Sequence, residues 1–284
     1  MENIKGEIFM MTSSELKKDA LKNLKGHKAK AGGTFLVYFG FVLVISFVLG
    51  LMSVFVPFVS VLLQIAMYVI MPAILYGCIT VLMRIKRGEK ASAFSCISEG
   101  FKKIGKVLAA TIWGGIKLLL WILLMVVGVV LLSFVQYSID NQNVGAICAL
   151  VGAILYFVSM IVLLIKSFKY VLVNYLIFDN PDMSGKQIVE KSAELMKGNC
   201  GRYFGLSLSF FGWFILLYFG MGISGAAMSS FWISATERIL GTVGYFVCLF
   251  LVGFLLVPYI QMSYISFYEE LIGKNKEEEV TENF

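Results

Sequence analysis

A lysine inside an apolar run is the first residue of this chain whose type and position could do chemistry. Lys117 lies in TIWGGIKLLLWILL, between Trp113 and Trp121. A lysine at the centre of a bilayer costs about 2.5–3.5 kcal/mol on insertion scales. It is tolerated where it lines a polar cavity, or where its long side chain reaches the membrane surface. Both interpretations of Lys117, a cavity-lining charge and a snorkelling one, stay open.

Four further basic residues lie near the ends of apolar runs. Lys166 and Lys169 belong to LLIKSFKYVLVNY, and Lys197 and Arg202 to MKGNCGRYF. Lysine and arginine at a membrane surface attract phosphate headgroups. The same residues also serve as plain positive anchors that orient a membrane protein. We therefore take Lys117 and these four as candidate headgroup or cavity contacts.

Catalytic chemistry finds little support in the remaining polar residues. No Asp or Glu lies at mid-depth in an apolar run, and His27 is the only histidine. A histidine-based triad or a multi-histidine metal site cannot be built from one histidine. The five cysteines are scattered without a CxxC pair, which indicates reduced, buried thiols rather than a disulfide framework or a zinc site. The sequence predicts no catalytic residue, no metal and no cofactor, and we expect that the protein is not an enzyme.

The elements that position these residues are membrane-spanning helices. Hydrophobic residues make up 59% of the 284 residues, charged residues only 15%, and the mean hydropathy is +0.84. Soluble domains are closer to half apolar and a quarter charged. Runs of 18 or more apolar residues predict transmembrane helices. The predicted spans cover residues 33–56, 59–83, 107–136, 144–178, 202–228 and 239–268.

The basic residues predict how the chain is oriented. Of the 24 lysines and arginines, all but Lys117 and Arg238 fall in the N-terminal tail, the C-terminal tail, or the connections and adjoining span ends on that same side. Such a bias places both termini in the cytoplasm of a multi-pass protein of the cell (cytoplasmic) membrane. The first 31 residues do not resemble a removable signal peptide. We expect a basic tail over 1–31, one six-span domain over 32–271 and a charged tail over 272–284.

Three connections predict amphipathic helices. They are TSSELKKDALKNLKG, SAFSCISEGFKKIGKVL and SGKQIVEKSAELMKG. The first and third begin with capping boxes, Thr12 with Glu15 and Ser184 with Gln187. The second places Phe94, Ile97 and Phe101 on one face. The predicted fold is therefore all-α, a polytopic membrane protein with six transmembrane helices plus three cytoplasmic amphipathic helices. The repeated order indicates either a triplication or the ordinary alternation of any six-span protein.

Several residues predict breaks and close contacts in these helices. Pro72 and Pro258 should kink the second and sixth spans because each lacks an amide proton. Gly198 and Gly201 can supply a turn with positive φ after the third amphipathic helix. Gly212 is one of several small residues that would let the fifth span pack closely, and the Gly145, Ala149, Ala153 series predicts a helix contact in the fourth.

The last third of the chain resembles a known family. It contains an Asp-Asn-Pro turn, a Ser-x-x-x-Met-Lys-Gly helix end, a Leu-Ser-Phe-x-Gly-Trp span start and a closing Pro-Tyr with Phe-Tyr-x-x-Leu. These motifs resemble the bacterial integral membrane proteins grouped as domain of unknown function 975. The resemblance implies a fold and a compartment but no activity. The residues that carry the turn, the helix end and the span start are Asp179, Asn180, Pro181, Ser192, Met196, Lys197, Gly198, Leu208, Ser209, Phe210, Gly212 and Trp213.

These observations leave two functional hypotheses. The first is a permease-like or accessory subunit that handles a lipid, a peptide or an export complex. The second is a structural scaffold that docks a soluble cytoplasmic partner. The expected surroundings are a bilayer with anionic headgroups and a membrane or cytoplasmic protein partner, and no nucleic acid, because the net charge of +6 is better explained by topology and anionic lipid.

Overall fold

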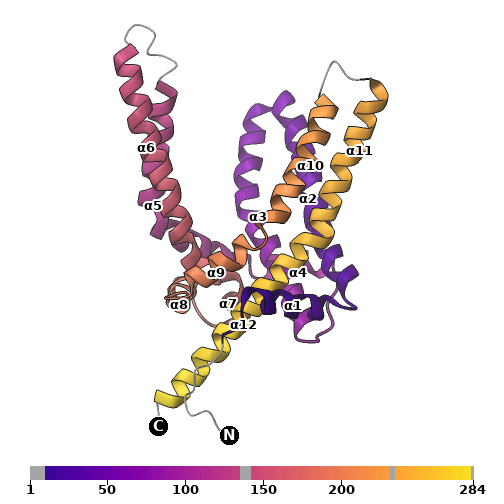
Figure 1. Ribbon diagram of the computed structural model, residues 1–284, viewed down its shortest axis with the longest axis vertical. Helices are drawn as coiled ribbons and strands as arrows, with labels where there is room; N and C mark the ends of the chain where they lie inside the picture. Colours follow the sequence, from indigo (N-terminus) through magenta and orange to yellow (C-terminus); the bar gives the residue numbers. More distant parts are fainter. Residues whose placement is uncertain (1–9, 135–141, 230–233, 283–284) are drawn as a thin grey trace. The chain divides into compact units, whose positions relative to one another are not determined.

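The computed structural model describes residues 10–134, 142–229 and 234–282, and in these ranges all regular secondary structure is helical (Figure 1). The chain forms two compact units. Unit 1 comprises the residues up to Val107 together with those from Arg202 onward, and unit 2 comprises Leu108–Gly201. The division into a membrane domain over 32–271 and two tails stays a prediction, and residues 1–9, 283 and 284 of those tails lie outside the described residues.

The predicted spans correspond to long apolar helices. Among the described residues, five helices are long and apolar enough to cross a membrane, or six if one bent pair counts as a single span. The all-α class is therefore confirmed, with five or six candidate spans. The first three predicted spans appear as α2 (Lys28–Phe55), α3 (Pro57–Lys86) and α5 (Ile104–Phe134), and the fourth begins as α6 (Gln142–Ser167).

The fifth predicted span is not one straight helix. It consists of α9 (Cys200–Leu208) and α10 (Phe211–Ser229), and the apolar parts of the two are bent by 41°. Phe210 lies at the break and is fully buried. The carbonyl of Ser209 is left without its helical partner and accepts a hydrogen bond from the Lys17 ammonium at 2.9 Å. The break is thus stabilised by a side chain from the N-terminal helix.

The sixth predicted span is longer than predicted. It runs as α11 (Ala235–Leu251), a π-helical turn η3 (Val252–Leu256) and α12 (Val257–Glu282). The helical segment from Ala235 to Lys274, 40 residues long, corresponds to about 60 Å, twice the ~30 Å of a hydrocarbon core. The π turn lies directly before Pro258, whose ring collides with the carbonyl four residues earlier in a regular helix. By contrast, α3 continues through Pro72 as a single helix.

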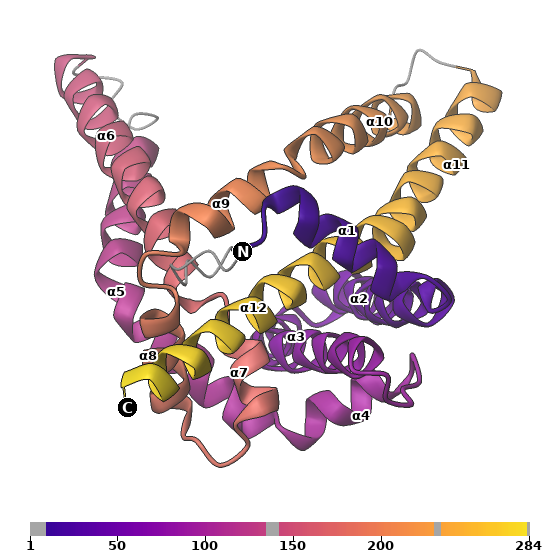
Figure 2. The ribbon, with the colours of Figure 1, turned by 60° about the horizontal axis from the view of Figure 1, so that its bottom comes forward.

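Unit 1 gathers its buried residues at one end of the long helices. There α1 (Ser13–Leu24) lies against α12 (Figure 2), and the predicted Thr12–Glu15 capping box starts it. α1 buries Leu16, Ala20 and Leu24. In α2, by contrast, only 6% of the apolar stretch is buried. The helix side chains that remain exposed are mostly apolar, as expected of a surface that faces lipid.

A short helix, α4 (Ser95–Lys102), packs on α3 through small residues. A Cβ placed on Gly77 would lie 1.8 Å from the Cys96 carbonyl oxygen, and one on Gly100 would lie 2.4 Å from the Ala73 carbonyl oxygen. Only hydrogen fits at either position. The Ala73–Gly77 and Cys96–Gly100 pairs are thus two small-xxx-small motifs that face each other.

The predicted apolar face of this helix is not the side that packs on α3. Phe94 and Phe101, which the sequence analysis places on one face, are 73% and 44% exposed. The close backbone approach at Gly77 selects the opposite face, because Cys96 and Gly100 leave enough room and phenylalanine does not.

In unit 2, α5 and α6 form a hairpin with a tight crossing. A Cβ on Gly128 would lie 2.9 Å from the Gly152 carbonyl oxygen, and one on Gly152 would lie 3.0 Å from the Gly128 carbonyl oxygen. Gly145, Gly152 and Ser159 are buried at seven-residue spacing. The contact therefore follows a heptad stripe rather than the predicted Gly145, Ala149, Ala153 series.

The remainder of unit 2 consists of short helices. They are η2 (Phe168–Tyr170), α7 (Val173–Asp179) and α8 (Gly185–Leu195). The predicted Ser184–Gln187 capping box starts α8. The Ser192 hydroxyl donates to the Lys169 carbonyl at 2.8 Å and so ties α8 to η2. A Cβ on Gly185 would meet the Ala110 amide nitrogen at 2.7 Å, so α8 also packs closely on α5.

Candidate functional site

Unit 2 carries a group of aromatic and basic side chains, which we call the tryptophan–lysine cluster: Trp113, Lys117, Trp121, Lys166 and Lys186. Trp113, Lys117 and Trp121 are spaced four residues apart on α5 and so lie along one side of this helix. The Lys166 ammonium lies 4.8 Å from the ring centroid of Trp121, and that of Lys186 lies 5.6 Å from the ring centroid of Trp113. Three helices thus place ammonium groups around one pair of indoles.

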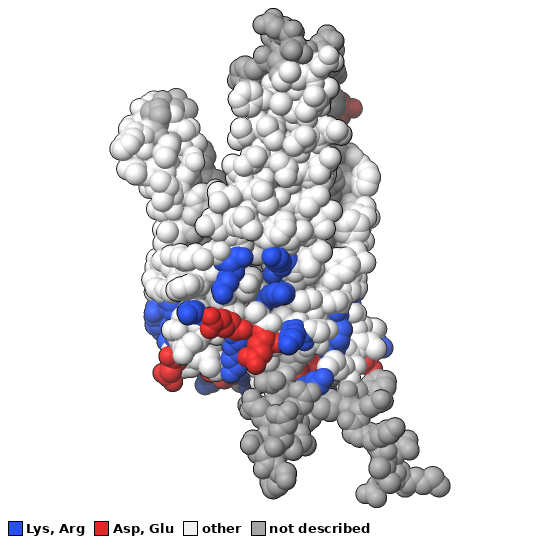
Figure 3. Space-filling model, turned by 90° about the vertical axis from the view of Figure 1, so that its left-hand side faces the viewer, with Lys and Arg blue, Asp and Glu red and all other residues white. Residues whose placement is uncertain are grey.

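The lysines of this region carry positive charge without compensation. The part of the chain that the structure describes offers no carboxylate partner to Lys117, Lys166, Lys169 or Lys186. Lys117 and Lys169 are exposed. Figure 3 shows basic side chains gathered where the long uncharged surface ends. Unpaired ammonium groups beside indole rings are suited to a phosphate headgroup at a membrane interface.

The predicted turn residues lie at the ends of short helices. Asn180 caps α7, and its side-chain amide donates to the Leu176 carbonyl at 3.2 Å. Asp179 is the last residue of α7, and Pro181 follows the cap. Lys197 is exposed after α8, and the next residue, Gly198, has the predicted positive φ, of 81°. Gly201, by contrast, lies inside α9.

Arg202 has a different environment from the other candidates. Its Nη2 donates to Glu270 at 2.9 and 3.0 Å and to the Met11 carbonyl at 3.0 Å. Its guanidinium also lies over the Phe267 ring. The charge is therefore compensated, and the contacts tie α9 to α12 and to the residue before Thr12. This environment favours a structural tie over a headgroup contact.

A second group of charges holds α1 in place, and we call it the α1 clasp: Asp19, Lys86, Ser266 and Glu269. The Lys86 ammonium, on a side chain only 10% exposed, lies 3.1 Å from Asp19, 3.0 Å from Glu269 and 2.7 Å from the Ser266 hydroxyl. Ser266 in turn donates to Asp19 at 2.7 Å. Burial alone raises the pKa of Asp19, but the hydrogen bonds from Ser266 and Lys86 and the Lys86 charge outweigh it, so the pKa lies below its usual value.

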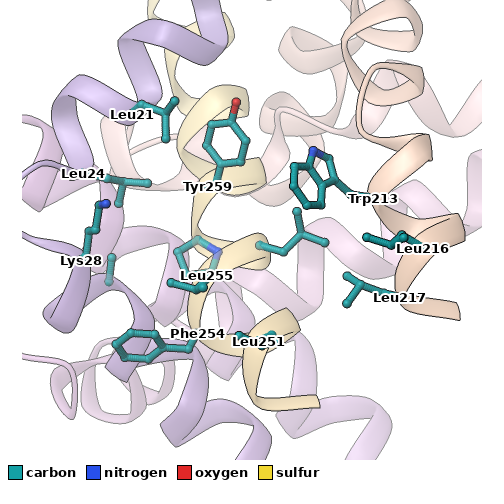
Figure 4. Close-up of a pocket in the computed structure, with 13 residues that line it drawn as sticks. Leu21, Leu24, Lys28, Trp213, Leu216, Leu217, Leu251, Phe254, Leu255 and Tyr259 are labelled. Atoms are coloured by element: carbon teal, nitrogen blue, oxygen red, sulfur yellow. The ribbon is translucent and has the colours of Figure 1, made fainter. Parts of the chain in front are cut away.

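Unit 1 also contains an apolar pocket of about 420 Å³. Figure 4 shows its walls, which come from α1, α2, α10 and the helix that continues from α11 through η3 into α12. Twelve of the thirteen lining residues are uncharged, and the exception is Lys28. The lining residues are Leu21, Leu24, Lys28, Ala31, Trp213, Leu216, Leu217, Leu251, Phe254, Leu255, Leu256, Pro258 and Tyr259.

The polar atoms of this pocket gather at one end. In Figure 4 the Lys28 ammonium, the Tyr259 hydroxyl and the Trp213 indole nitrogen all point toward the end formed by Leu21. Leu251 and other apolar side chains line the opposite end. The pocket is therefore graded from polar to apolar along its length.

The predicted packing and hinge residues fall partly on this pocket. Trp213 and Pro258 line it. Pro72 lines a second cavity of about 560 Å³ between α2 and α3. A Cβ on Gly212 would meet nothing within 4 Å, so the close packing expected there is not found at this residue. Tight contacts occur instead at other glycines that the sequence analysis missed, among them Gly32, Gly77, Gly100, Gly128, Gly152 and Gly185.

No group of three or more His, Cys, Asp or Glu side chains suited to a metal ion occurs among the described residues.

The family described as "Protein of unknown function (DUF975)" matches residues 10–275 of the chain. Neither a curated protein nor a solved structure matches it.

Proposed function

Because the chain belongs to the DUF975 family of proteins of unknown function and is a multi-pass membrane protein, we propose that it is a non-enzymatic, permease-like or accessory subunit that handles a lipid, a peptide or an export complex. The family assigns no activity, so the proposal depends on the side chains at the ends of the helices.

The proposed topology has six spans, with α9 and α10 counted as one. The helices α1, α4 and α8 lie at the cytoplasmic membrane surface, and both termini face the cytoplasm. The distribution of lysine and arginine supports this orientation, because only Lys117 and Arg238 depart from it. The positive charge gathered at one surface would also place the protein against the anionic inner leaflet of a bacterial cell membrane.

The single observation that carries the proposal is the tryptophan–lysine cluster. Its ammonium groups lack described carboxylate partners and two of them lie over indole rings. A purely structural lysine pair is usually satisfied by a carboxylate or a carbonyl, whereas an unpaired group beside tryptophan favours an external anion. The anion available at this depth is the phosphate of a phospholipid.

Lipid retention by the purified protein tests this role. The full chain is reconstituted in phosphatidylcholine vesicles with and without phosphatidylglycerol, extracted into mild detergent and weighed with its retained lipids by native mass spectrometry. We expect retained phosphatidylglycerol, and a loss of about tenfold or more in the double variant Lys166→Gln with Lys186→Gln, at ~1 kcal/mol per lysine. Transfer of labelled lipid or peptide across the same vesicles is measured in parallel.

The control is the double variant Lys22→Gln with Lys90→Gln, two exposed lysines of unit 1 that lie outside the cluster. It removes the same charge and should retain phosphatidylglycerol normally. Equal retention by both double variants would contradict a role for the cluster. A protein that retained no lipid or peptide and changed no flux would refute the proposal as a whole.

One observation favours the alternative, a scaffold for a soluble partner. Phe94 and Phe101 of α4 are exposed on a helix that the proposed topology puts at the cytoplasmic surface. Two neighbouring exposed phenylalanines suit a protein contact. Cross-linking in cells followed by identification of the neighbours tests it: a partner captured reproducibly by the unaltered chain should be lost from Phe94→Ser with Phe101→Ser.

A further inference from the structure

We propose that the apolar pocket of unit 1 binds one acyl chain of an anionic membrane phospholipid, with the phosphate at Lys28. The inference rests on the proposed function in taking a lipid as the molecule that the protein handles. It concerns a different unit and different residues from the tryptophan–lysine cluster.

The volume of the pocket suits a single chain. A methylene group is about as large as a water molecule, which takes ~30 Å³ in the liquid. A cavity of about 420 Å³ thus holds on the order of fourteen such groups, which is one acyl chain and not two. Leucine, phenylalanine and proline side chains form most of the wall, and such a lining selects an apolar occupant over a peptide backbone.

The polarity gradient fixes the direction of the occupant. Lys28, Tyr259 and Trp213 present their polar atoms at the end next to Leu21 (Figure 4). An amphiphile with its headgroup at this end places its chain between α10 and η3, among Leu217, Leu251 and Phe254. An occupant that was apolar throughout would leave the three polar atoms facing hydrocarbon.

The charge of Lys28 selects an anionic headgroup. None of the described residues provides Lys28 with a carboxylate. The pocket wall also includes side chains that are exposed on the apolar surface of the unit: Leu216, Leu255 and Trp213 are 64%, 49% and 55% exposed. The pocket is therefore continuous with the surface that faces lipid, and the occupant enters sideways from the bilayer. The second cavity, between α2 and α3, has no charged side chain in its lining and so offers no charge to an anionic headgroup.

The chain offers a fluorescent reporter inside the pocket. Trp213 lines it, and replacing Trp113, Trp121 and Trp232 by phenylalanine leaves Trp213 as the only tryptophan. This full-length protein is reconstituted in phosphatidylcholine vesicles that contain either brominated phosphatidylglycerol or brominated phosphatidylcholine at the same mole fraction. Bromine on an acyl chain quenches a tryptophan that it touches, so the ratio of the two quenching curves reports headgroup preference at the pocket.

We expect stronger quenching by the brominated phosphatidylglycerol. Lys28→Gln should reduce that preference about fivefold. The matched control is Lys30→Gln, which removes the same charge two residues further along α2 but does not line the pocket. A second variant, Leu217→Phe, fills the pocket and should reduce quenching by both lipids, whereas Leu240→Phe on the exposed side of α11 should not.

Equal quenching by the two lipids in the unaltered pocket would overturn the inference, and so would equal effects of Lys28→Gln and Lys30→Gln. Circular dichroism and a single peak in gel filtration are required of each variant, and Leu217→Phe gives a second route if Lys28→Gln does not fold. The outcome is separate from that of the proposed function. The retention experiment changes Lys166 and Lys186, whereas the proteins compared by quenching share the Trp113→Phe and Trp121→Phe background and differ only at Lys28, Lys30, Leu217 or Leu240.

Discussion

Replacing Gly77 by alanine should separate α4 from α3. The new Cβ would lie 1.8 Å from the Cys96 carbonyl oxygen, whereas real Cβ atoms essentially never approach closer than 3.0 Å. The helices must therefore move apart by about 1.2 Å, the difference between these two distances. The obstacle is backbone, so no side-chain rotation relieves it. Overpacking of this kind costs about 1–3 kcal/mol, occasionally more, and we expect the upper end.

Gly40→Ala is the matched control. Gly40 also lies inside a long apolar helix, α2, and a Cβ there meets nothing within 4 Å. Both substitutions gain the same helix propensity, ~1 kcal/mol over glycine. That gain cancels in the comparison, so the two variants should differ in unfolding free energy by about 3 kcal/mol, which is the cost of the contact alone.

Two buried cysteines report on the same contact. Cys78 and Cys96 are fully buried beside Gly77, and replacing Cys148, Cys200 and Cys248 by serine leaves them as the only thiols. A thiol-reactive dye then follows their exposure as the detergent-solubilised protein is heated. Gly77→Ala should label at a temperature several degrees lower than Gly40→Ala. Identical labelling curves would show that α4 does not pack through Gly77, and would refute the reasoning.

The remaining predictions concern the α1 clasp and two other glycine contacts. Asp19 has a lowered pKa, so its stabilisation of α1 is present above its usual value of 3.8 and is lost as pH falls through the lower folded value. The protection of the α1 amides, measured by hydrogen exchange relative to the intrinsic exchange rate at each pH, should therefore fall at acidic pH, and should change less in Asp19→Asn. Lys86→Met leaves two carboxylates facing each other, so at neutral pH it should expose α1 to protease more than Asp19→Asn does. Gly128→Ala should lower the thermal stability of the α5–α6 hairpin by about 1–3 kcal/mol, while Gly114→Ala, with open space around it, should not. Gly32→Ala should have a similar cost, because its Cβ would lie 2.6 Å from the Phe254 carbonyl oxygen; denaturation midpoints in detergent measure both costs.

The long helices could be predicted from the sequence because their signal is local. A run of about twenty apolar residues must satisfy its own backbone in a membrane and therefore forms a helix. The same holds for helix starts such as Thr12 and Ser184, where the capping residue and its partner are three positions apart. A third capping box, Ser234 with Glu237 at the start of α11, has the same pattern and could have been found in the same way.

The close contacts could not be predicted from one segment at a time. The facing pairs Ala73–Gly77 and Cys96–Gly100 each read as an ordinary small-xxx-small motif. Neither segment on its own indicates that the other segment packs against it. In the segment of α4 the larger apolar residues, among them Phe94 and Phe101, form the stronger local pattern, yet these two are exposed and the opposite face packs on α3. Where two backbones touch, the absence of a side chain decides which face packs.

The bend in the fifth span and the pocket could not be predicted from local sequence either, because both depend on the N-terminal helix α1. Lys17 satisfies the carbonyl freed at the bend between α9 and α10, so the bend depends on a residue 192 positions away. Asp19 holds the same helix in the clasp, and Leu21 lines the pocket next to its polar end. One short helix therefore stabilises the bend, closes the ion-pair network and completes the pocket wall. A movement of α1 that releases Asp19 would also remove a wall of the pocket and the partner of the bent span, so we expect the proposed lipid binding in unit 1 to depend on the position of α1.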